Sequence, residues 1–204
     1  MCSSDLAVSG ARSTTTEPWD AVIIGAGVSG IYQLHRLLGL GLRTVVLEAG
    51  SDAGGTWYWN RYPGARFDSE SYSYQYSWCP DVLAEWNWSE HFAAQPETLR
   101  YLHHVVERYD LRRHMRFGMR VTEAAWDDAS EYWTVRTEAG DEVRGRFLVC
   151  ALGVLSVPTM PRFEGMDSFA GPSFHTARWP HEPLRSEEHT SELQSHHDLV
   201  CRLL

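Results

Sequence analysis

The sequence has little cysteine, little positive charge and no long apolar run. Its 204 residues include only four cysteines, whose positions fit neither a disulfide framework nor a zinc site. Lys and Arg number 18 against 27 Asp and Glu, so the formal net charge of −9 disfavours nucleic acid and anionic membrane surfaces. No apolar run approaches the roughly 20 residues that span a bilayer, and the N-terminus lacks a secretory signal pattern. We therefore expect a cytoplasmic protein without metal, membrane or nucleic-acid partners.

What remains is an ordinary globular composition, 43% hydrophobic and 22% charged, in a length that suits one domain with a core. The aromatic residues are concentrated in one stretch: five of the nine Trp lie between Trp57 and Trp88. That stretch predicts either a packed core under a long loop or a wall around a flat cofactor, and aromatic density alone favours the core. Cys150 lies in an apolar run, which predicts a buried thiol.

Both ends of the sequence match translated sequencing-adaptor DNA. The common adaptor reads RSEEHTSELQS in one frame, which is Arg185 to Ser195, and its continuation gives LVCRLL at the C-terminus. The other adaptor strand, with GTG as start codon, gives MCSSDL, which is residues 1–6. We expect residues 1–6 and 185–204 to be adaptor-derived and residues 7–184 to be an incomplete genuine domain. The alternative is that the tail is a charged helix or linker.

A strand–helix–strand unit opens the domain. The β-branched run 21–24 is typical of a buried strand, and apolar residues within 31–38 recur at helical spacing. Gly39 is expected to end that helix, and the run 44–47 predicts a second strand that is closed by Glu48. A helix between two buried strands predicts an α/β fold with a parallel sheet.

The turn between the first strand and the helix carries the pattern G-x-G-x-x-G. Gly25 permits a tight turn, Gly27 lets the backbone approach a pyrophosphate, and Gly30 lets the helix pack closely on the sheet. Unpaired N–H groups at the start of the helix attract phosphate. Glu48, 23 residues after Gly25, is placed to accept hydrogen bonds from a ribose diol. This unit predicts a Rossmann-like dinucleotide site but does not distinguish FAD from NAD.

Two longer motifs follow. Residues 54–68 read GGTWYWNRYPGARFD and fit [A/G]-G-x-W-x-x-x-x-[F/Y]-P-[G/M]-x-x-x-D. A second pattern, F-x-G-x-x-x-H-x-x-x-W, is matched by Phe169, Gly171, His175 and Trp179. With the dinucleotide unit in front of them, these motifs resemble the Baeyer–Villiger flavin monooxygenases, and the resemblance covers Trp19 to Pro183.

The resemblance implies the FAD-binding domain of a two-dinucleotide-domain flavoprotein, with a parallel sheet and a three-stranded antiparallel meander. It implies a single FAD groove formed by Gly25, Gly27, Ser29, Gly30, Glu48, Gly55, Thr56, Trp57, Asp68, Tyr74 and Val121. In this assignment Trp57 lies along the flavin, Tyr74 lies beside it, and a backbone group near Val121 reads the adenine. Asp68 lies where flavin and nicotinamide meet, and His175 couples domains. Without the resemblance, Asp68 would be interpreted as a turn acid and His175 as a surface residue.

The rest of the chain agrees with this fold. The segments 121–125, 132–137 and 142–146 alternate like a meander, and 147–151 is expected as a separate buried strand. A helix is expected to begin at Pro96 and to carry a histidine pair, His103 and His104, which we interpret as structural rather than as a metal site.

The resemblance implies that NADPH reduces the bound FAD, which then activates O₂ to insert oxygen next to a ketone carbonyl, giving an ester or lactone. Residues 50–204 contain neither a second G-x-G-x-x-G turn for NADPH nor the downstream active-site arginine. We therefore assign no catalytic residue and expect the chain alone to be inactive. Two alternatives remain: an N- or S-oxygenating flavin monooxygenase, disfavoured by Trp57 and Trp179, and a non-catalytic flavin-binding module.

Overall fold

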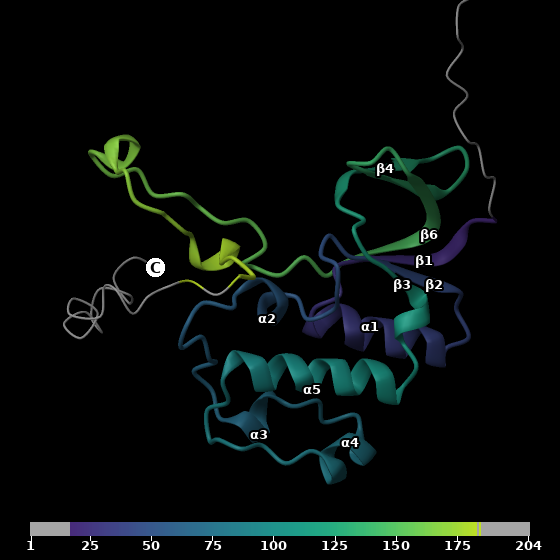
Figure 1. Cartoon of the computed structure of the whole chain (residues 1–204). Helices are drawn as coiled ribbons and strands as arrows, with labels where there is room; N and C mark the ends of the chain where they lie inside the picture. The colour runs from purple at the N-terminus through teal and green to yellow at the C-terminus, as the bar shows by residue number, and fades with distance from the viewer. Residues whose placement is uncertain (1–16, 183, 185–204) are drawn as a thin grey trace, which may run out of the picture.

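A computed structural model of the chain describes residues 17–182 and residue 184. The expectations for residues 1–6 and 185–204, and for the first residues of the 7–184 domain, lie outside the described residues. Within them, a six-stranded sheet has the order β3-β2-β1-β6-β5-β4 (Figure 1). The strands are β1 Trp19–Ile24, β2 Thr44–Leu47, β3 Met115–Arg116, β4 Val121–Asp127, β5 Tyr132–Thr137 and β6 Glu142–Cys150.

The sheet has a parallel half and an antiparallel half. Strands β3, β2, β1 and β6 are parallel neighbours, whereas β6, β5 and β4 form an antiparallel meander. This arrangement confirms the predicted parallel sheet with a three-stranded antiparallel meander. The predicted strand 44–47 has the bounds of β2, and the predicted strand 21–24 begins two residues earlier, at Trp19.

Five helices and three short 3₁₀ turns accompany the sheet. They are α1 Val28–Gly39, α2 Thr56–Trp59, α3 Ser71–Tyr74, α4 Pro80–Glu85, α5 Gln95–Arg108, η1 Arg112–His114, η2 Met166–Ser168 and η3 Thr176–Arg178. Figure 1 shows α1 under the sheet, α5 under α1, and α3 with α4 beyond α5. Helix α1 ends at Gly39 and α5 begins next to Pro96, as the sequence predicts.

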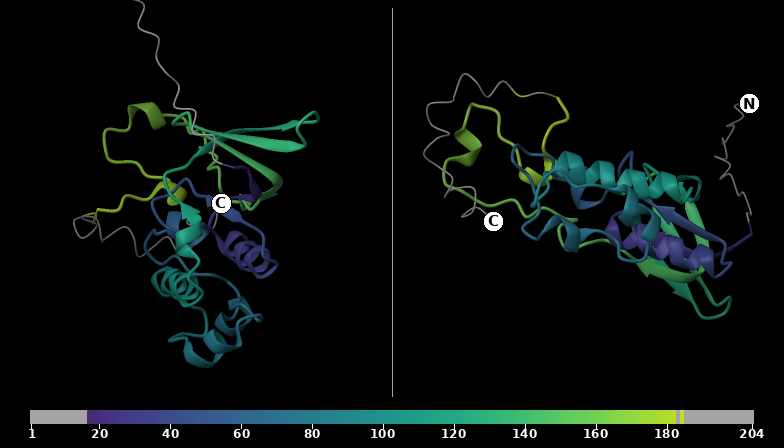
Figure 2. Two further views of the ribbon diagram at one scale, coloured as in Figure 1. Left: turned by 90° about the vertical axis from the view of Figure 1, so that its right-hand side faces the viewer. Right: turned by 90° about the horizontal axis from the view of Figure 1, so that it is seen from below.

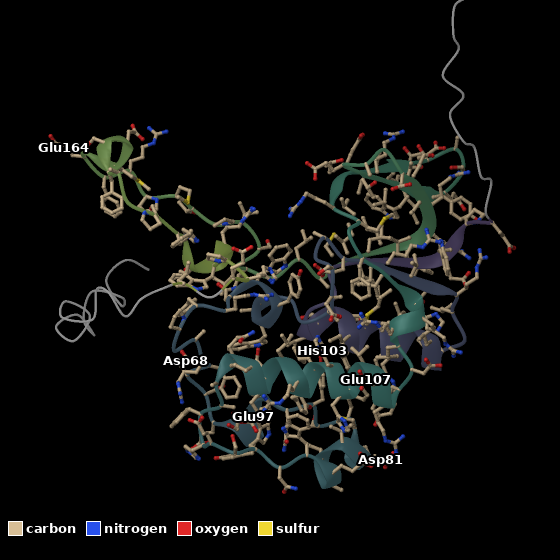
Figure 3. All side chains as sticks on the ribbon, viewed as in Figure 1. Asp68, Asp81, Glu97, His103, Glu107 and Glu164 are labelled. Atoms are coloured by element: carbon tan, nitrogen blue, oxygen red, sulfur yellow. The ribbon has the colours of Figure 1, made fainter. Side chains whose placement is uncertain are left out.

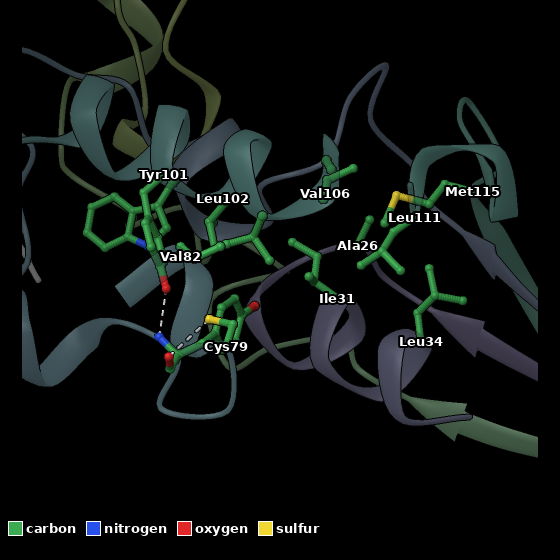
Figure 4. Packing of buried hydrophobic residues seen from close by; sticks show 14 of the residues in the cluster. Ala26, Ile31, Leu34, Cys79, Val82, Tyr101, Leu102, Val106, Leu111 and Met115 are labelled. Carbon is green, nitrogen blue, oxygen red and sulfur yellow. Dashed lines mark hydrogen bonds between the residues drawn. The ribbon is translucent and has the colours of Figure 1, made fainter. Parts of the chain in front are cut away.

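The main core lies between the sheet, α1 and α5. Ile31 and Leu34 of α1 and Leu102 of α5 are fully buried there, and Val82 of α4 closes the far side (Figure 4). Burying each such side chain stabilises the fold by about 1.5–3 kcal/mol relative to leaving it exposed. This packing holds the ends of β1 and β2 and the start of α1 in fixed positions relative to one another.

One prediction about the sheet is wrong. The segments 142–146 and 147–151 are not two strands, because β6 runs without interruption from Glu142 to Cys150. Gly145 is where β6 changes partners: it pairs with Trp133 of β5 on one side and with Trp19 of β1 on the other. A Cβ on Gly145 would lie 2.6 Å from Cγ2 of Val22, so only glycine allows this close crossing.

The expected burial of the second half of β6 is also wrong. Phe147 is 53% exposed, and the Cys150 thiol is exposed rather than buried. These two side chains lie on opposite faces of β6, because they are three residues apart in one continuous strand, so neither face of this end of β6 is completely covered. An apolar run predicts a strand, but it does not predict what covers each of its faces.

After β6 the chain leaves the sheet. We call residues 152–182 the arm and residues 17–151 the body; the arm extends away from the sheet and carries η2 and η3 (Figure 2). Most of the large apolar side chains that are exposed lie in the arm or beside it: Phe147, Leu152, Val154, Leu155, Val157, Met160, Phe163, Phe169 and Phe174. Across the part of the chain that the structure describes, no helix combines the length and hydrophobicity needed to span a membrane.

Candidate functional site

A cavity of about 490 Å³ lies where β1 and β2 end and α1 begins. Its walls come from the carboxyl ends of those two strands, the first turn of α1, helix α2, the residues that lead into β4, and the arm. Open α/β sheets bind ligands at the carboxyl ends of their parallel strands. The position therefore matches the predicted dinucleotide site.

Most of the predicted site residues meet in this cavity. Those that line it are Gly25, Gly27, Ser29, Glu48, Gly55, Thr56, Tyr74 and Val121. They come from five separate stretches of sequence, which the fold brings to one place. Three predicted residues, Gly30, Trp57 and Asp68, are not among the residues that line the cavity.

The glycine turn creates a place for a phosphate. Gly25 has φ +103°, and a Cβ there would lie 2.6 Å from the carbonyl oxygen of Ala151. Helix α1 follows with Gly27 as its N-cap, no side chain capping it and no acidic residue in its first turn. The first N–H groups of a helix lack partners within the helix and carry a partial positive charge. With no side chain competing for them, they are free to bind an anion.

The aromatic loop is held against this turn by glycine contacts. A Cβ on Gly55 would lie 2.6 Å from the Cα of Gly27, and the Gly54 N–H donates to the Ala26 carbonyl at 2.9 Å. Any side chain at Gly55 would separate the two backbones. The contact therefore makes α2, which starts at Thr56, a continuation of the phosphate-binding turn.

Glu48 is buried, with 4% of its surface exposed, and its carboxylate accepts hydrogen bonds from two backbone amides. Its Oε2 accepts the Ala26 N–H and its Oε1 accepts the Gly50 N–H, both at 2.7 Å. A carboxylate has about four acceptor sites, so each oxygen keeps capacity for a further hydrogen bond from a ligand hydroxyl. Glu48 thus fixes the glycine turn and faces the cavity at the same time.

Trp57 lies behind the cavity rather than in its wall. Its side chain is 6% exposed and belongs to the main core, and its indole N–H donates to the Tyr74 hydroxyl at 2.7 Å. Tyr74 lines the cavity in front of it and stacks on Phe67, with ring centroids 4.5 Å apart and planes at 10°. Trp57 therefore supports the cavity wall through its hydrogen bond to Tyr74, and it is not among the residues that line the cavity.

Gly30 and Asp68 are also absent from the cavity walls. Gly30 lies in the first turn of α1, where a Cβ would be 1.9 Å from the Gly25 carbonyl oxygen. Its role in the structure is close packing, as the sequence predicts. The Asp68 side chain is exposed, near the start of α5 and away from the sheet (Figure 3). The turn that contains Asp68 points it outward.

The histidines make local contacts. Nε2 of His103 lies 3.0 Å from the Ala53 carbonyl oxygen, and that of His104 lies 3.5 Å from the Glu85 carboxylate. His175 caps η3 by accepting the Ala177 N–H at Nδ1, and it borders a second cavity, of about 520 Å³, formed entirely within the arm. Within residues 17–182 and 184, no group of three or more His, Cys, Asp or Glu is arranged to hold a metal ion.

Sequence reasoning missed several residues of the cavity. They are Trp59, Asn60, Met119, Arg120, Leu152 to Val157, Ala177 and Arg178, together with backbone neighbours of the predicted residues. Arg120 directly precedes the predicted Val121, and Arg178 lies inside the second motif. Their positions in the sequence could therefore have identified both as candidate site residues. Their positive charges suit an anionic ligand.

The arm reaches the cavity because α2 holds it. The Arg61 guanidinium donates to Nδ1 of His181 at 2.8 Å and lies over the Tyr58 ring at 5.0 Å. Arg61 follows α2 directly, so the aromatic loop binds both the glycine turn and the arm. Ala177 and Arg178, which precede His181 in the arm, line the same cavity as Thr56.

Comparisons with known proteins agree with this geometry. Residues 22–187 match the family model described as pyridine nucleotide-disulphide oxidoreductase. An acetone monooxygenase (methyl acetate-forming) of Gordonia sp. (strain TY-5) is 46% identical over 84% of this chain and 32% of its own length. A phenazine N-monooxygenase of Lysobacter antibioticus is 42% identical over 79% of this chain and 30% of its own length.

Among solved structures, an oxidised steroid monooxygenase bound to NADP is 54% identical, with a TM-score of 0.77. The match covers 82% of this chain and 32% of that one. The chain thus spans about a third of the length of the monooxygenases it matches. The glycine turn, the buried Glu48 and the surrounding sheet all lie within the matched region, and the chain belongs to the pyridine nucleotide-disulphide oxidoreductase family.

Proposed function

We propose that residues 7–184 form the FAD-binding part of an NADPH-dependent Baeyer–Villiger monooxygenase. The observation that carries this proposal is that one cavity is lined by Glu48 and Val121, by the glycine turn, and also by Thr56 and Tyr74. A site for a nucleoside diphosphate alone needs only the first part of this wall. The extension along α2 supports a longer ligand with a second ring system.

The residues present fit FAD. Glu48 can accept hydrogen bonds from the adenosine ribose, and the uncapped N-terminus of α1 can bind the diphosphate. The contact between Gly27 and Gly55 keeps side chains out of the space where the diphosphate would pass. Arg120 and Arg178 add positive charge to the same walls. These features support FAD, and the full set of predicted site residues remains part of the proposal.

FAD supplies the redox chemistry in such an enzyme, using hydride from NADPH and activating O₂. The residues of this chain would bind and orient it. Glu48 would hold the adenosine, the first turn of α1 the diphosphate, and the α2 segment the flavin side. We propose a ketone as the substrate of the whole protein, because the Gordonia relative is named for forming methyl acetate from acetone. A cytoplasmic location is part of the same proposal.

The first experiment tests the cofactor. FAD, NADP⁺ and ADP are each titrated into the purified 204-residue chain while flavin fluorescence or the heat of binding is followed. We expect FAD to bind more tightly than ADP, because the α2 wall adds contacts, and NADP⁺ to bind no more tightly than ADP. Equal affinities for FAD and ADP would contradict the proposal that the cavity extends to the flavin.

Oxygenation at nitrogen is the second candidate function, favoured by the phenazine N-monooxygenase among the relatives. Product analysis of the whole protein with a ketone and with a nitrogen heteroarene such as phenazine separates the two. An ester or lactone from the ketone supports the first proposal. An N-oxide without any ester would replace it with the second. A protein that binds FAD but oxidises no NADPH with either compound would support a non-catalytic module.

A further inference from the structure

Tyr74 has a hydrogen-bond donor that the described residues do not use. Its hydroxyl accepts the Trp57 indole N–H at 2.7 Å, and among residues 17–182 and 184 no group accepts the hydroxyl proton. A tyrosine hydroxyl can donate one hydrogen bond as well as accept. Trp57 lies in the core behind Tyr74, whereas Tyr74 itself lines the cavity. The remaining O–H bond is therefore available on the cavity side.

The orientation of this phenol is tightly defined. Phe67 stacks on the Tyr74 ring, and the Trp57 ring meets it edge-on, with centroids 5.8 Å apart and planes at 85°. Trp57 is held in turn, because the Gln95 side-chain amide donates to its carbonyl oxygen. A hydroxyl rotates about its C–O bond, and a fixed indole donor leaves it fewer directions in which to point its own proton. Trp57 thus restricts the direction in which the Tyr74 hydroxyl can donate its hydrogen bond.

Burial raises the pKa of Tyr74, and the hydrogen bond from Trp57 offsets part of this rise. The phenol therefore keeps its proton at physiological pH and remains a donor. The hydrogen bond from Trp57 places Tyr74 against α2, the part of the cavity wall that we assign to the flavin side. A ligand atom that meets Tyr74 there belongs to the half of the dinucleotide that follows the diphosphate.

We propose that Trp57 is a positioning residue that directs the Tyr74 hydroxyl toward an acceptor atom on the flavin half of FAD. This inference rests on the proposed function, and it changes the role of Trp57 from a flavin contact to a support for Tyr74. The recognised group is a hydrogen-bond acceptor on the ribityl or ring part of the cofactor. The adenosine half takes no part in it.

The test uses conservative variants of the 204-residue chain and two ligands, FAD and ADP. Tyr74→Phe removes only the hydroxyl, and Trp57→Phe removes the indole N–H but keeps an aromatic ring. One lost hydrogen bond weakens binding by about three- to tenfold. We expect each variant to lower FAD affinity by about that factor while ADP affinity stays unchanged. The double variant should bind FAD no more weakly than Tyr74→Phe, because the two residues act through one hydroxyl.

Trp88→Phe is the matched control. Trp88 lies in the same aromatic cluster, 6.0 Å from Phe67, and donates its indole N–H to Gln75, but it does not line the cavity. Its variant should lose stability without losing FAD affinity. Thermal unfolding of every variant shows which ones fold. If Trp57→Phe does not fold, the ratio of FAD affinity to ADP affinity measured for Tyr74→Phe decides the proposal.

Each outcome has a definite meaning. Unchanged FAD affinity in Tyr74→Phe, with FAD and ADP both bound by the parent chain, overturns this inference and leaves the proposed function standing. Additive losses in the double variant overturn the positioning role of Trp57. An equal loss for FAD and ADP overturns the assignment to the flavin half. A parent chain that binds neither ligand overturns the proposed function and this inference together.

Discussion

Valine side chains are mostly buried in the body and exposed in the arm. Val45 and Val46 in the body are at most 1% exposed, whereas Val154 and Val157 in the arm are 99% and 81% exposed. The difference lies in the layers around them. In the body, Val46 packs in the core with α1 and α5, and Val45 packs on the other face of the sheet with Val135 of β5 and Val143 of β6, while the arm has no paired strand. Hydrophobicity alone therefore does not determine burial in this chain, and the following substitutions test that contrast.

The largest effect is expected from Gly30→Ala in the body. The new Cβ would lie 1.9 Å from the Gly25 carbonyl oxygen, so the turn or the helix must move. We expect a loss of about 3 kcal/mol in the free energy of unfolding. Gly153 in the arm has no atom within 4 Å but has φ +72°, so Gly153→Ala should cost about 1–2 kcal/mol of strain within the arm and leave the unfolding midpoint of the body unchanged. Thermal denaturation followed by circular dichroism measures both.

Gly39→Ala is the control on the same helix. Nothing lies within 4 Å of a Cβ at Gly39, and alanine is the better helix former. This variant should keep or gain up to about 1 kcal/mol. Equal destabilisation by Gly30→Ala and Gly39→Ala would show that α1 does not pack as closely on the turn as described.

A valine pair tests burial directly. Val46→Ala removes two methyl groups from a fully buried site, which we expect to cost about 2–3 kcal/mol in transfer and cavity energy. Val154→Ala removes the same groups from a fully exposed site and should change stability by less than about 0.5 kcal/mol. Denaturant titration compares the two. A loss above about 1 kcal/mol for Val154→Ala would mean that the arm is covered in solution.

A pair of buried glutamates refines the comparison within the body. Glu48 and Glu97 each accept two hydrogen bonds, Glu48 from the Ala26 and Gly50 amides and Glu97 from the amide and hydroxyl of Ser89. Replacing either by Gln turns one acceptor into a donor and should cost about 1–3 kcal/mol of stability. Only Glu48→Gln should also weaken ADP binding, since Glu97 is not in the cavity wall. Calorimetry with ADP distinguishes them, and equal ADP affinities would remove Glu48 from the ligand site.

The smallest effect concerns Asp52, next to the aromatic loop. Burial would raise the pKa of Asp52, but hydrogen bonds from Arg112 and the Ala53 amide, together with the charge of His103, outweigh this and lower it. A lowered folded pKa stabilises the protein above the unfolded pKa, about 4, and this contribution is lost as pH falls through the folded pKa.

Asp52→Asn should therefore cost about 0.5 kcal/mol at pH 7, the magnitude of a partly exposed ion pair. The difference from the parent chain should shrink to nothing as the pH approaches 2. Asp167→Asn, an exposed residue of the arm, should change the stability of the body at neither pH. Denaturant titrations at several pH values check this, and a pH-independent loss in Asp52→Asn would contradict the ionic origin.

Local sequence patterns predicted much of the body. The β-branched run 44–47 is strand β2, and the G-x-G-x-x-G turn leads from β1 into α1. These elements form for local reasons, namely apolar periodicity and the steric freedom of glycine. The glycine pattern identified Glu48, whereas Thr56 and Tyr74 were expected only from the resemblance to the Baeyer–Villiger flavin monooxygenases; all three line one cavity.

Sequence and structure differ where tertiary contacts decide. Trp57 and Asp68 are fixed positions of one motif, yet a hydrogen bond to Tyr74 draws Trp57 inward while a turn leaves Asp68 in solvent. The partner exchange at Gly145 has no local signal, since it depends on strands far apart in sequence. Likewise, nothing near Arg178 shows that Arg61 will bring the arm to the cavity.

The exchange of partners at Gly145 also bears on the order of folding. Strand β1 is completed by β2, about twenty residues later, and by β6, whose Phe147 pairs with Ala21. The β1–α1–β2 unit can form as soon as it leaves the ribosome, but the second edge of β1 stays open until the chain reaches Cys150. Closing such a long loop is slow, and an open apolar strand edge invites pairing with other chains. During synthesis, the residues of the glycine turn therefore leave the ribosome long before Ala151, against which Gly25 packs.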